Sequence, residues 1–282
     1  MVLSHLPKLS DGLKQNNLWA KKSFGQHFLL DENFCYKIAA LTQHVEGKYV
    51  AEVGPGPGGL SRAIISRNPK AFTMIEMDKD FAPMLIPLSD IAPSIQIHWG
   101  DALKVDIPAL FPSNKITLLS NLPYNIGTVL LIGWLKDIQK FEELVLMFQK
   151  EVALRICAQK GDKHYGRLAV MTNWLCKTQL ALKVPPAAFT PPPKVDSAVI
   201  IVTPRPQPLF NVSFKSMEFV VAAAFNMRRK MLKRSLKSFD IPWETLDINP
   251  TLRPEELDIE DFGKIAKYLE DTNHPSLTTK TS

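Results

Sequence analysis

A glycine-rich segment directly after a short apolar run constrains the fold of this chain most strongly. Residues 49–53 read Tyr-Val-Ala-Glu-Val, and the chain continues Gly-Pro-Gly-Pro-Gly-Gly-Leu. An apolar run that stops at glycines is typical of a buried strand that leads through a tight turn into a helix. Glycines in such a turn let the main chain approach a ligand closely. The segment therefore predicts an α/β domain that binds a ligand at the carboxyl end of this strand.

The spacing of Gly54, Gly56 and Gly59 does not identify that ligand. It fits the dinucleotide fingerprint, so a nicotinamide cofactor and S-adenosylmethionine both remain open. The next predicted strand, residues 71–75, ends in Glu76. A carboxylate at that strand end can accept hydrogen bonds from the ribose hydroxyls that both cofactors carry. The first two strand ends therefore leave the choice between the two cofactors unresolved.

Polar residues at the next two strand ends favour S-adenosylmethionine over a nicotinamide cofactor. A third predicted strand, residues 95–99, is followed by Asp101, where the adenine amine of a nucleoside would lie. A fourth, residues 116–119, leads to Asn121. Glycines, Glu, Asp and Asn at successive strand ends are ordered as in a class I methyltransferase, and no hydride-relay residue of a dehydrogenase stands out. We therefore predict a methyltransferase that uses S-adenosylmethionine.

Residues 120–128 read Ser-Asn-Leu-Pro-Tyr-Asn-Ile-Gly-Thr and are the predicted centre of the reaction. Pro123 pushes the preceding residue into an extended conformation, so Asn121 and the Leu122 carbonyl can face one point, beside the aromatic face of Tyr124. Two fixed acceptors can hold the hydrogens of an adenine amine and draw its nitrogen toward tetrahedral geometry. No general base is then required in the transition state. The alternative reading is a plain tight turn, because Asn and Pro are common turn residues.

A second aromatic residue is predicted to lie on the target base. Residues 189–194 read Phe-Thr-Pro-Pro-Pro-Lys, a stiff extended arm that would hold Phe189 in a defined place. A base removed from its stack needs aromatic surfaces, and Tyr124 with Phe189 could sandwich it. The alternative is that Phe189 is an ordinary core aromatic.

Composition limits the class of protein. The chain has 282 residues, of which 45% are apolar, and its longest apolar runs fall far short of a membrane span, so we expect a globular protein without a membrane partner. Its three cysteines are widely spaced, with no Cys-x-x-Cys pair and no signal peptide. We interpret them as buried thiols of a cytoplasmic protein and expect no metal site.

Charge is concentrated in one segment of the chain. Residues 215–237 contain seven Lys or Arg against the single acid Glu218, within a chain of net charge +6. Such a segment is the usual mark of a polyanion partner, although most charge runs are only solvated helix faces. We predict a helix capped by Asn226 whose basic residues contact RNA. The predicted RNA-binding residues are Arg228, Arg229, Lys230, Lys233 and Arg234.

Proline clusters and periodicity suggest how the chain is divided. Residues 204–208 contain three prolines and mark a boundary, and residues 258–269 carry a capping box and an apolar stripe typical of a last helix. We predict a catalytic domain followed by a small all-helical domain. The expected segments are a loose extension over 1–20, the catalytic domain over 21–205, the helical domain over 206–272 and a disordered tail over 273–282.

Taken together, five motifs resemble those of the adenine dimethyltransferases that modify ribosomal RNA, in the branch that acts on the small subunit. They are Phe-Gly-Gln-His-Phe-Leu at 24–29, Glu-Val-Gly-Pro-Gly at 52–56, Asn-Leu-Pro-Tyr-Asn at 121–125, Phe-Thr-Pro-Pro-Pro-Lys-Val-Asp-Ser at 189–197 and Phe-Asn-Met-Arg-Arg-Lys-Met-Leu at 225–232. The resemblance spans about residues 21–269. It implies a Rossmann-like class I methyltransferase fold, a seven-stranded sheet with a helical C-terminal domain.

The resemblance also implies an activity and a partner. The family transfers four methyl groups from S-adenosylmethionine to two neighbouring adenosines near the 3′ end of small-subunit rRNA, and it acts as a checkpoint in ribosome assembly. The implied partner is small-subunit rRNA within a pre-ribosomal particle, and a monomer is the simplest expectation.

Carried over residue by residue, the resemblance assigns the cofactor and the base. The implied cofactor contacts are His27, Leu29, Gly54, Glu76, Asp101 and Asn121, with Tyr124 and Phe189 on the target base. The family usually has Asn where His27 stands, so a contact to the methionine part of the cofactor would depend here on imidazole protonation. Gly127 replaces a commoner Ser at the edge of the pocket.

Two other functions stay open at this point. One is the related antibiotic-resistance type of enzyme that methylates adenine in large-subunit rRNA; the basic segment and the full match at 189–197 argue against it. The other is a mainly non-catalytic RNA-binding assembly factor, for which Asn121 would matter little and Arg228 and Arg229 would matter strongly.

Overall fold

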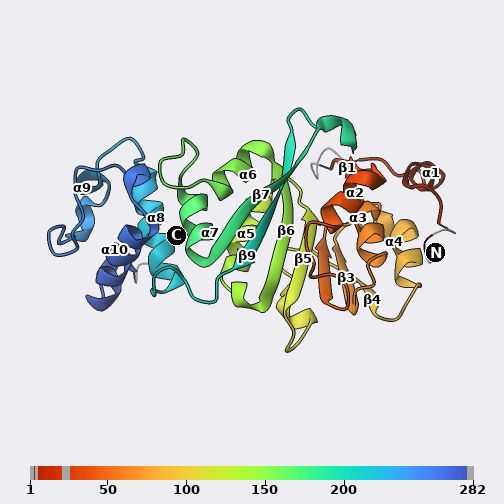
Figure 1. Ribbon diagram of the computed structural model, residues 1–282, viewed down its shortest axis with the longest axis horizontal. Coiled ribbons are helices and arrows are strands. Elements are labelled where there is room, and N and C mark those ends of the chain that lie inside the picture. Colours follow the sequence, from red (N-terminus) through yellow and green to blue (C-terminus); the bar gives the residue numbers. More distant parts are fainter. Residues whose placement is uncertain (1–2, 4–5, 21–25, 278–282) are drawn as a thin grey trace. The chain divides into compact units, whose positions relative to one another are not determined.

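The chain is divided into two compact units (Figure 1). The structure is a computed structural model that describes residue 3 and residues 6–20 and 26–277. The first unit comprises Met1–Ala153 with Gln179–Pro204, and the second comprises Leu154–Thr178 with Arg205–Ser282. In this division residues 154–178, which the sequence prediction placed in the catalytic domain, group with the helical unit.

A seven-stranded sheet organises the first unit, and its order is β4-β3-β2-β5-β6-β9-β7. The five strands from β4 to β6 run parallel, and β9 lies antiparallel to β6. The strands are β2 (Tyr49–Val53), β3 (Ala71–Glu76), β4 (Ile95–Trp99), β5 (Ile116–Asn121), β6 (Phe141–Gln149), β7 (Cys176–Val184) and β9 (Ser197–Pro204). This sheet confirms the predicted α/β class.

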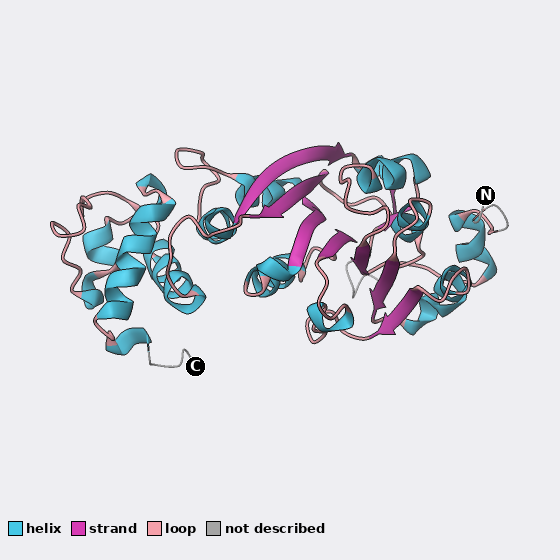
Figure 2. Ribbon diagram, turned by 60° about the horizontal axis from the view of Figure 1, so that its bottom comes forward, coloured by secondary structure: helices cyan, strands magenta, loops and turns pink. Residues whose placement is uncertain are grey.

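Burial explains why the central strands are almost wholly apolar. Val50 and Ala51 of β2 and Leu118 and Leu119 of β5 have 0% exposure, as expected for parallel strands covered on both faces. Figure 2 shows helices on both sides of these strands. The helices along this part of the chain are α2 (Glu32–Ala39), α3 (Gly59–Ile65), α4 (Ala82–Ser89), α5 (Gly127–Leu135) and α6 (Lys150–Cys157).

The expected loose N-terminal extension contains a helix, α1 (Leu9–Gln15). Leu9 and Leu13, one turn apart on the same face, are both buried. Asn16 closes the end of the helix by donating from Nδ2 to the Gly12 oxygen. The prediction failed here because two leucines in a seven-residue helix give too short a pattern to register as periodic.

A separate two-stranded ladder ties the start of the first unit to its proline-rich arm. β1 (Phe28–Leu29) pairs antiparallel with β8 (Phe189–Thr190), with Phe28 opposite Thr190 and Leu29 opposite Phe189. Residues 24 and 25 of the motif that precedes β1 lie outside the described residues.

The second unit is helical, with α7 (Arg167–Leu175), α8 (Phe214–Asn226), α9 (Leu232–Ser235) and α10 (Ile259–Asp271). The indole Nε1 of Trp174 in α7 donates to the Phe210 oxygen at 2.8 Å, and its ring lies 6.1 Å from that of Phe214. These contacts explain why the segment carrying α7 joins this unit. At α10 the predicted capping box is present, formed by Asp258 and Asp261.

The predicted basic helix is broken into shorter pieces. Asn226 is the last residue of α8 rather than the cap of a new helix, and α9 has four residues. The main-chain N–H groups of Leu232 and Lys233 donate to the oxygens of Leu252 and Pro250, at 2.8 and 3.0 Å. Because these N–H groups bond a neighbouring segment, they are not available to extend α8.

Two further features concern the ends of the chain and a possible membrane contact. A 3₁₀ turn, Pro275–Leu277, lies within the predicted disordered tail, and the remaining residues, 278–282, are outside the described part. Among the residues that the structure describes, no helix combines the length and the apolar composition needed to cross a lipid bilayer.

Candidate active site

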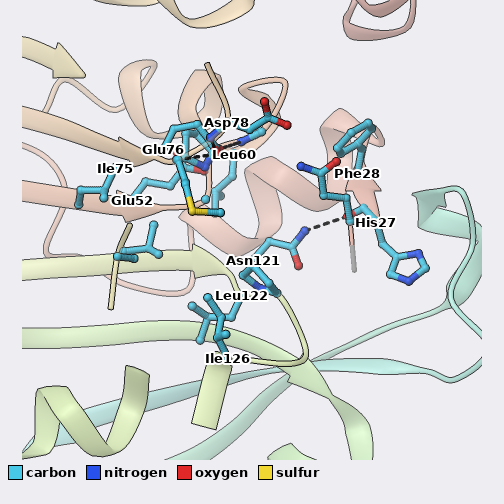
Figure 3. A pocket seen from close by; sticks show the side chains of 18 of the residues that line it. His27, Phe28, Glu52, Leu60, Ile75, Glu76, Asp78, Asn121, Leu122 and Ile126 are labelled. Atoms are coloured by element: carbon cyan, nitrogen blue, oxygen red, sulfur yellow. Dashed lines mark hydrogen bonds between the residues drawn. The ribbon is translucent and has the colours of Figure 1, made fainter. Parts of the chain in front are cut away.

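A cavity of about 270 Å³ opens at the carboxyl ends of β2, β3 and β5 (Figure 3). Parallel strands place their carboxyl ends at one edge of the sheet, so residues far apart in sequence meet there. Most of the predicted site residues line this cavity, and Phe189 does not appear among the described lining residues. The predicted site residues that line the cavity are His27, Leu29, Gly54, Glu76, Asp101, Asn121, Leu122 and Tyr124.

The glycine turn after β2 forms one wall of the cavity. Gly54 and Gly56 have φ angles of 68° and 52°, in the left-handed region that other residues adopt at a cost. The Gly56 N–H donates to Glu76 Oε2 at 3.0 Å. This bond connects the end of β3 to the glycine turn after β2. Glu76 therefore stabilises the conformation of that turn.

Glu76 is a nearly buried carboxylate that accepts several main-chain N–H groups. Its Oε1 also accepts from the N–H groups of Met77 and Asp78, at 2.9 and 2.8 Å. Burial raises the pKa of Glu76, and the hydrogen bonds from Asp78, Gly56 and Met77 oppose that rise. Two carboxylate oxygens offer about four acceptor positions, so one remains for a hydroxyl donor in the cavity.

Glu52 also lines the cavity, and sequence reasoning gave it no role. It has 1% exposure and its Oε2 accepts from Ser61 Oγ at 2.5 Å. Desolvation by burial raises the pKa of Glu52 to about 8, with the Ser61 bond acting in the opposite direction. The signal in the sequence was a single acid within the otherwise uncharged run 49–53.

The loop after β5 is held in place on both sides of Asn121. Ser120 is buried and its Oγ donates to the Val53 oxygen at 2.5 Å, which fixes the end of β5 against β2. Asn121 Nδ2 donates to the main-chain oxygen of His27 at 3.2 Å, as the dashed line in Figure 3 shows. A carboxamide that donates through its nitrogen keeps its oxygen as an acceptor. Asn121 Oδ1 is therefore directed away from His27 as an acceptor for a ligand.

The ring of Tyr124 is held at its hydroxyl end. Tyr124 Oη and Ser197 Oγ lie 2.6 Å apart, and Ser197 is fully buried at the start of β9. Burial raises the pKa of the Tyr124 hydroxyl, and the Ser197 hydrogen bond opposes that rise. Sequence reasoning quoted Ser197 as part of a motif and did not recognise this role.

His27 contacts Asn121 through its main-chain oxygen, and its imidazole ring contacts other residues. Its Nδ1 lies 2.8 Å from the Pro191 oxygen, and its ring centroid lies 5.6 Å from that of Tyr124. Figure 3 shows the imidazole pointing away from Asn121. The prediction placed this side chain on the cofactor with a contact set by protonation, whereas the structure engages Nδ1 with a main-chain oxygen.

Phe189 differs from its predicted place. It has 3% exposure and belongs to the apolar core of the first unit, opposite Leu29 in the β1–β8 ladder. Its side chain packs in this core, as the alternative reading expects, and its stacking on the target base stays a prediction.

Asp101 keeps an acceptor at the far end of the cavity. Its Oδ1 accepts from the Leu103 N–H at 3.0 Å, and its Oδ2 lies 4.0 Å from Lys104 Nζ. Its side chain retains 31% exposure, so the carboxylate can still meet a donor from the cavity. Within the described ranges, no group of three or more His, Cys, Asp or Glu side chains is arranged so that it could hold a metal ion.

The predicted RNA-binding residues divide into two groups within the second unit. Arg228 donates from Nη2 to the Lys163 oxygen at 3.1 Å, and its Nε lies 3.9 Å from Glu255. The other basic side chains are exposed and offer positive charge directly to solvent. They are Arg229, Lys230, Lys233 and Arg234.

Comparison with known proteins identifies the family. The sequence profile described as "Ribosomal RNA adenine dimethylase" matches residues 17–271 of the chain. The chain belongs to this family. The resemblance found in the sequence motifs is thereby confirmed.

Relatives of this chain are similar to it in sequence and in fold. The "Ribosomal RNA small subunit methyltransferase A" of Gluconobacter oxydans is 45% identical over 265 residues, covering 93% of this chain and 87% of the relative. The crystal structure of a dimethyladenosine transferase from Plasmodium falciparum is similar with a TM-score of 0.72 and 25% identity, covering 84% and 96% of the two chains. That of the 23S rRNA methyltransferase ErmE has a TM-score of 0.66 and 24% identity, with 86% and 99% covered. These structures confirm the methyltransferase fold.

Proposed function

We propose that this chain dimethylates two adjacent adenosines near the 3′ end of small-subunit rRNA, with S-adenosylmethionine as the methyl donor. The observation that carries the proposal is the hydrogen bond from Asn121 Nδ2 to the His27 oxygen. It leaves an uncharged acceptor, Oδ1, on a residue that lines the same cavity as Leu122 and Tyr124. An arrangement of this kind suits an amine attached to an aromatic ring.

The residues around the cavity fit S-adenosylmethionine. The glycine turn gives main-chain access, Glu76 has an acceptor position for a ribose hydroxyl, and Asp101 can accept from the adenine amine. A second ribose hydroxyl would replace one main-chain bond of Glu76, such as that from Gly56. When bound, the cofactor supplies a methyl group on a positively charged sulfur.

The chain's own residues prepare the substrate amine. Asn121 Oδ1 and the Leu122 carbonyl hold its hydrogens and reduce the delocalisation of its lone pair, an electrostatic effect worth roughly a hundredfold or more per group. The face of Tyr124 stabilises the positive charge that develops on nitrogen. The surplus proton leaves to water afterwards, so no side chain acts as a base. After one methylation only one N–H remains, and the second transfer must proceed with a single acceptor contact.

The partner and the cellular setting belong to the same proposal. The relatives at about 45% identity are named for the small subunit, and the exposed Arg229, Lys230, Lys233 and Arg234 suit rRNA phosphates. We propose that the substrate is a pre-ribosomal particle and that the protein acts as a monomer. A cytoplasmic location is in keeping with the free Cys35, Cys157 and Cys176.

Methylation of each purified ribosomal subunit in turn tests this proposal. The expected product is N6,N6-dimethyladenosine, found by mass spectrometry of nucleosides from small-subunit rRNA alone, with two such residues per molecule at completion. Dimethyladenosine in large-subunit rRNA would instead identify the antibiotic-resistance type of enzyme. Binding of the small-subunit precursor without any methylated product would identify a non-catalytic assembly factor.

A further inference from the structure

We propose that His27 is a positioning residue for both groups that face the adenine. Its main-chain oxygen sets the orientation of Asn121, and its imidazole supports the ring of Tyr124. The inference rests on the proposed function, since it specifies how the reacting base is placed.

The β1–β8 ladder brings His27 to this position. Phe28 pairs with Thr190, so His27 on one side and Pro191 on the other continue the antiparallel register. His27 Nδ1 lies 2.8 Å from the Pro191 oxygen. A carbonyl oxygen can only accept, so Nδ1 carries the hydrogen of this bond. The side chain is thus anchored to the proline-rich arm, and its main-chain oxygen is anchored with it.

The ring geometry argues against a base inserted between His27 and Tyr124. The rings of His27 and Tyr124 lie 5.6 Å apart between centroids, with a tilt of 30°. A base inserted between two rings needs two stacking distances, about 7 Å in total. The two centroids are closer than that, so no base fits between these two rings, and the proposal places the base on the part of the Tyr124 ring that the imidazole leaves uncovered. The imidazole then supports Tyr124 from behind, while Ser197 holds its hydroxyl.

The orientation of Asn121 decides what the substrate amine meets. With Nδ2 toward the His27 oxygen, Oδ1 is presented as an acceptor. The reversed carboxamide would bring two oxygens together at His27 and present a donor to the amine, which is itself a donor. An anchored His27 oxygen therefore selects the productive orientation.

Substitutions at position 27 can separate the hydrogen bond to the Pro191 oxygen from the ring contact with Tyr124. By its resemblance to the family, an Asn would be usual here, and Asn can donate to the Pro191 oxygen but offers no ring to Tyr124. Phe offers a ring but no donor. His27 supplies both, so His27→Asn and His27→Phe each remove one function, and His27→Ala removes both.

The test measures kcat, KM for purified small-subunit precursor and the Kd for S-adenosylmethionine in these three variants, with His44→Ala as a control away from the cavity. We expect His27→Ala to lower kcat roughly ten- to a hundredfold, with the cofactor Kd unchanged. Its product should be enriched in monomethyladenosine, because the second transfer depends most on placement. His27→Asn and His27→Phe should show smaller losses.

Two results would overturn the proposal. One is an unchanged kcat and an unchanged ratio of mono- to dimethyladenosine in His27→Ala and His27→Asn. The other is a rise in the cofactor Kd that accounts for the whole loss, which would make His27 a cofactor contact. If the wild-type protein yields no dimethyladenosine in the same assay, it is the proposed function that fails.

Discussion

Asn121 and His27, 94 residues apart in sequence, are joined by a hydrogen bond of 3.2 Å from the Asn121 side-chain nitrogen to the His27 main-chain oxygen. The bond connects the end of β5 to the residue that precedes β1. It turns a flexible carboxamide into a fixed acceptor, because only its oxygen then remains for a ligand. The position of the N-terminal ladder and the chemistry at the end of β5 therefore depend on each other.

The buried Glu52 should make stability depend on pH. Its pKa is raised from 4.5 to about 8, so the folded protein holds a proton that the unfolded chain releases between these values. The stabilisation from this bound proton is complete below pH 4.5, decreases as the pH rises from 4.5 to about 8, and is absent above that pH. Glu52→Gln cannot ionise and can still accept from Ser61. Relative to the wild type, the free energy of unfolding of Glu52→Gln should rise by up to about 1.4 kcal/mol per pH unit between pH 4.5 and about 8.

Urea unfolding between pH 5 and pH 9 measures this difference. Glu46→Gln, at an exposed position, is the control for exchanging a carboxyl for an amide. Parallel curves for Glu52→Gln and the wild type would show that Glu52 is ionised in the folded protein throughout the range.

Two glycine-to-alanine changes should shift the free energy of unfolding in opposite directions. A Cβ at Gly59 would lie 2.7 Å from the Leu29 main-chain oxygen, so Gly59→Ala should destabilise the protein by about 1–3 kcal/mol. Gly133, inside α5, has open space where a Cβ would stand, so Gly133→Ala should stabilise by about 0.5–1 kcal/mol. Denaturant midpoints measure both. Equal effects of the two changes would contradict the packing described at the start of α3.

The basic side chains of the second unit should differ in their contribution to RNA binding. Arg229 is exposed and free to meet phosphate, whereas Arg167 in α7 is paired with Glu218 at 3.0 Å. Arg229→Ala should weaken binding of small-subunit rRNA and lower the slope of log K against log salt by about one. Arg167→Ala is the matched control, with a smaller change in slope. An unaltered slope for Arg229→Ala would make this segment an ordinary solvated surface.

The cysteines should be unreactive in the folded protein. Burial raises the pKa of both Cys35 and Cys176 to about 12, and it also raises the pKa of Cys157. Since the thiolate is the reactive form, a thiol reagent at pH 8 should label these residues slowly before unfolding and completely after it. Rapid labelling of Cys35 in the folded protein would show that the packing around α2 opens readily.

Much of the site was predictable because its signals are local. A glycine turn after a strand, Glu76 at the next strand end and the Pro123 constraint before Tyr124 each depend on adjacent residues, and the parallel sheet then brings them to one edge. Contacts between distant segments were not predictable in this way. Phe189 was assigned to the base from its proline-rich setting, whereas its burial depends on the β1–β8 pairing, which leaves no trace in either two-residue strand.

Tertiary hydrogen bonds account for other differences from the predictions. The basic helix is interrupted because the N–H groups of Leu232 and Lys233 bond to residues 252 and 250, a contact with no local signature. The orientation of Asn121 likewise depends on His27, far away in sequence. Sequence patterns predicted which residues gather at the site, and long-range contacts determine which atoms they present.

Single-turnover methylation by Asn121→Ala tests the central claim most directly. The variant is compared with the wild type and with Asn114→Ala, a change in a loop outside the cavity lining. Purified small-subunit precursor is the substrate, and S-adenosylmethionine binding is measured in parallel. The account predicts a rate at least about a hundredfold lower for Asn121→Ala with cofactor binding retained, and wild-type behaviour for Asn114→Ala. An unchanged rate for Asn121→Ala would contradict it.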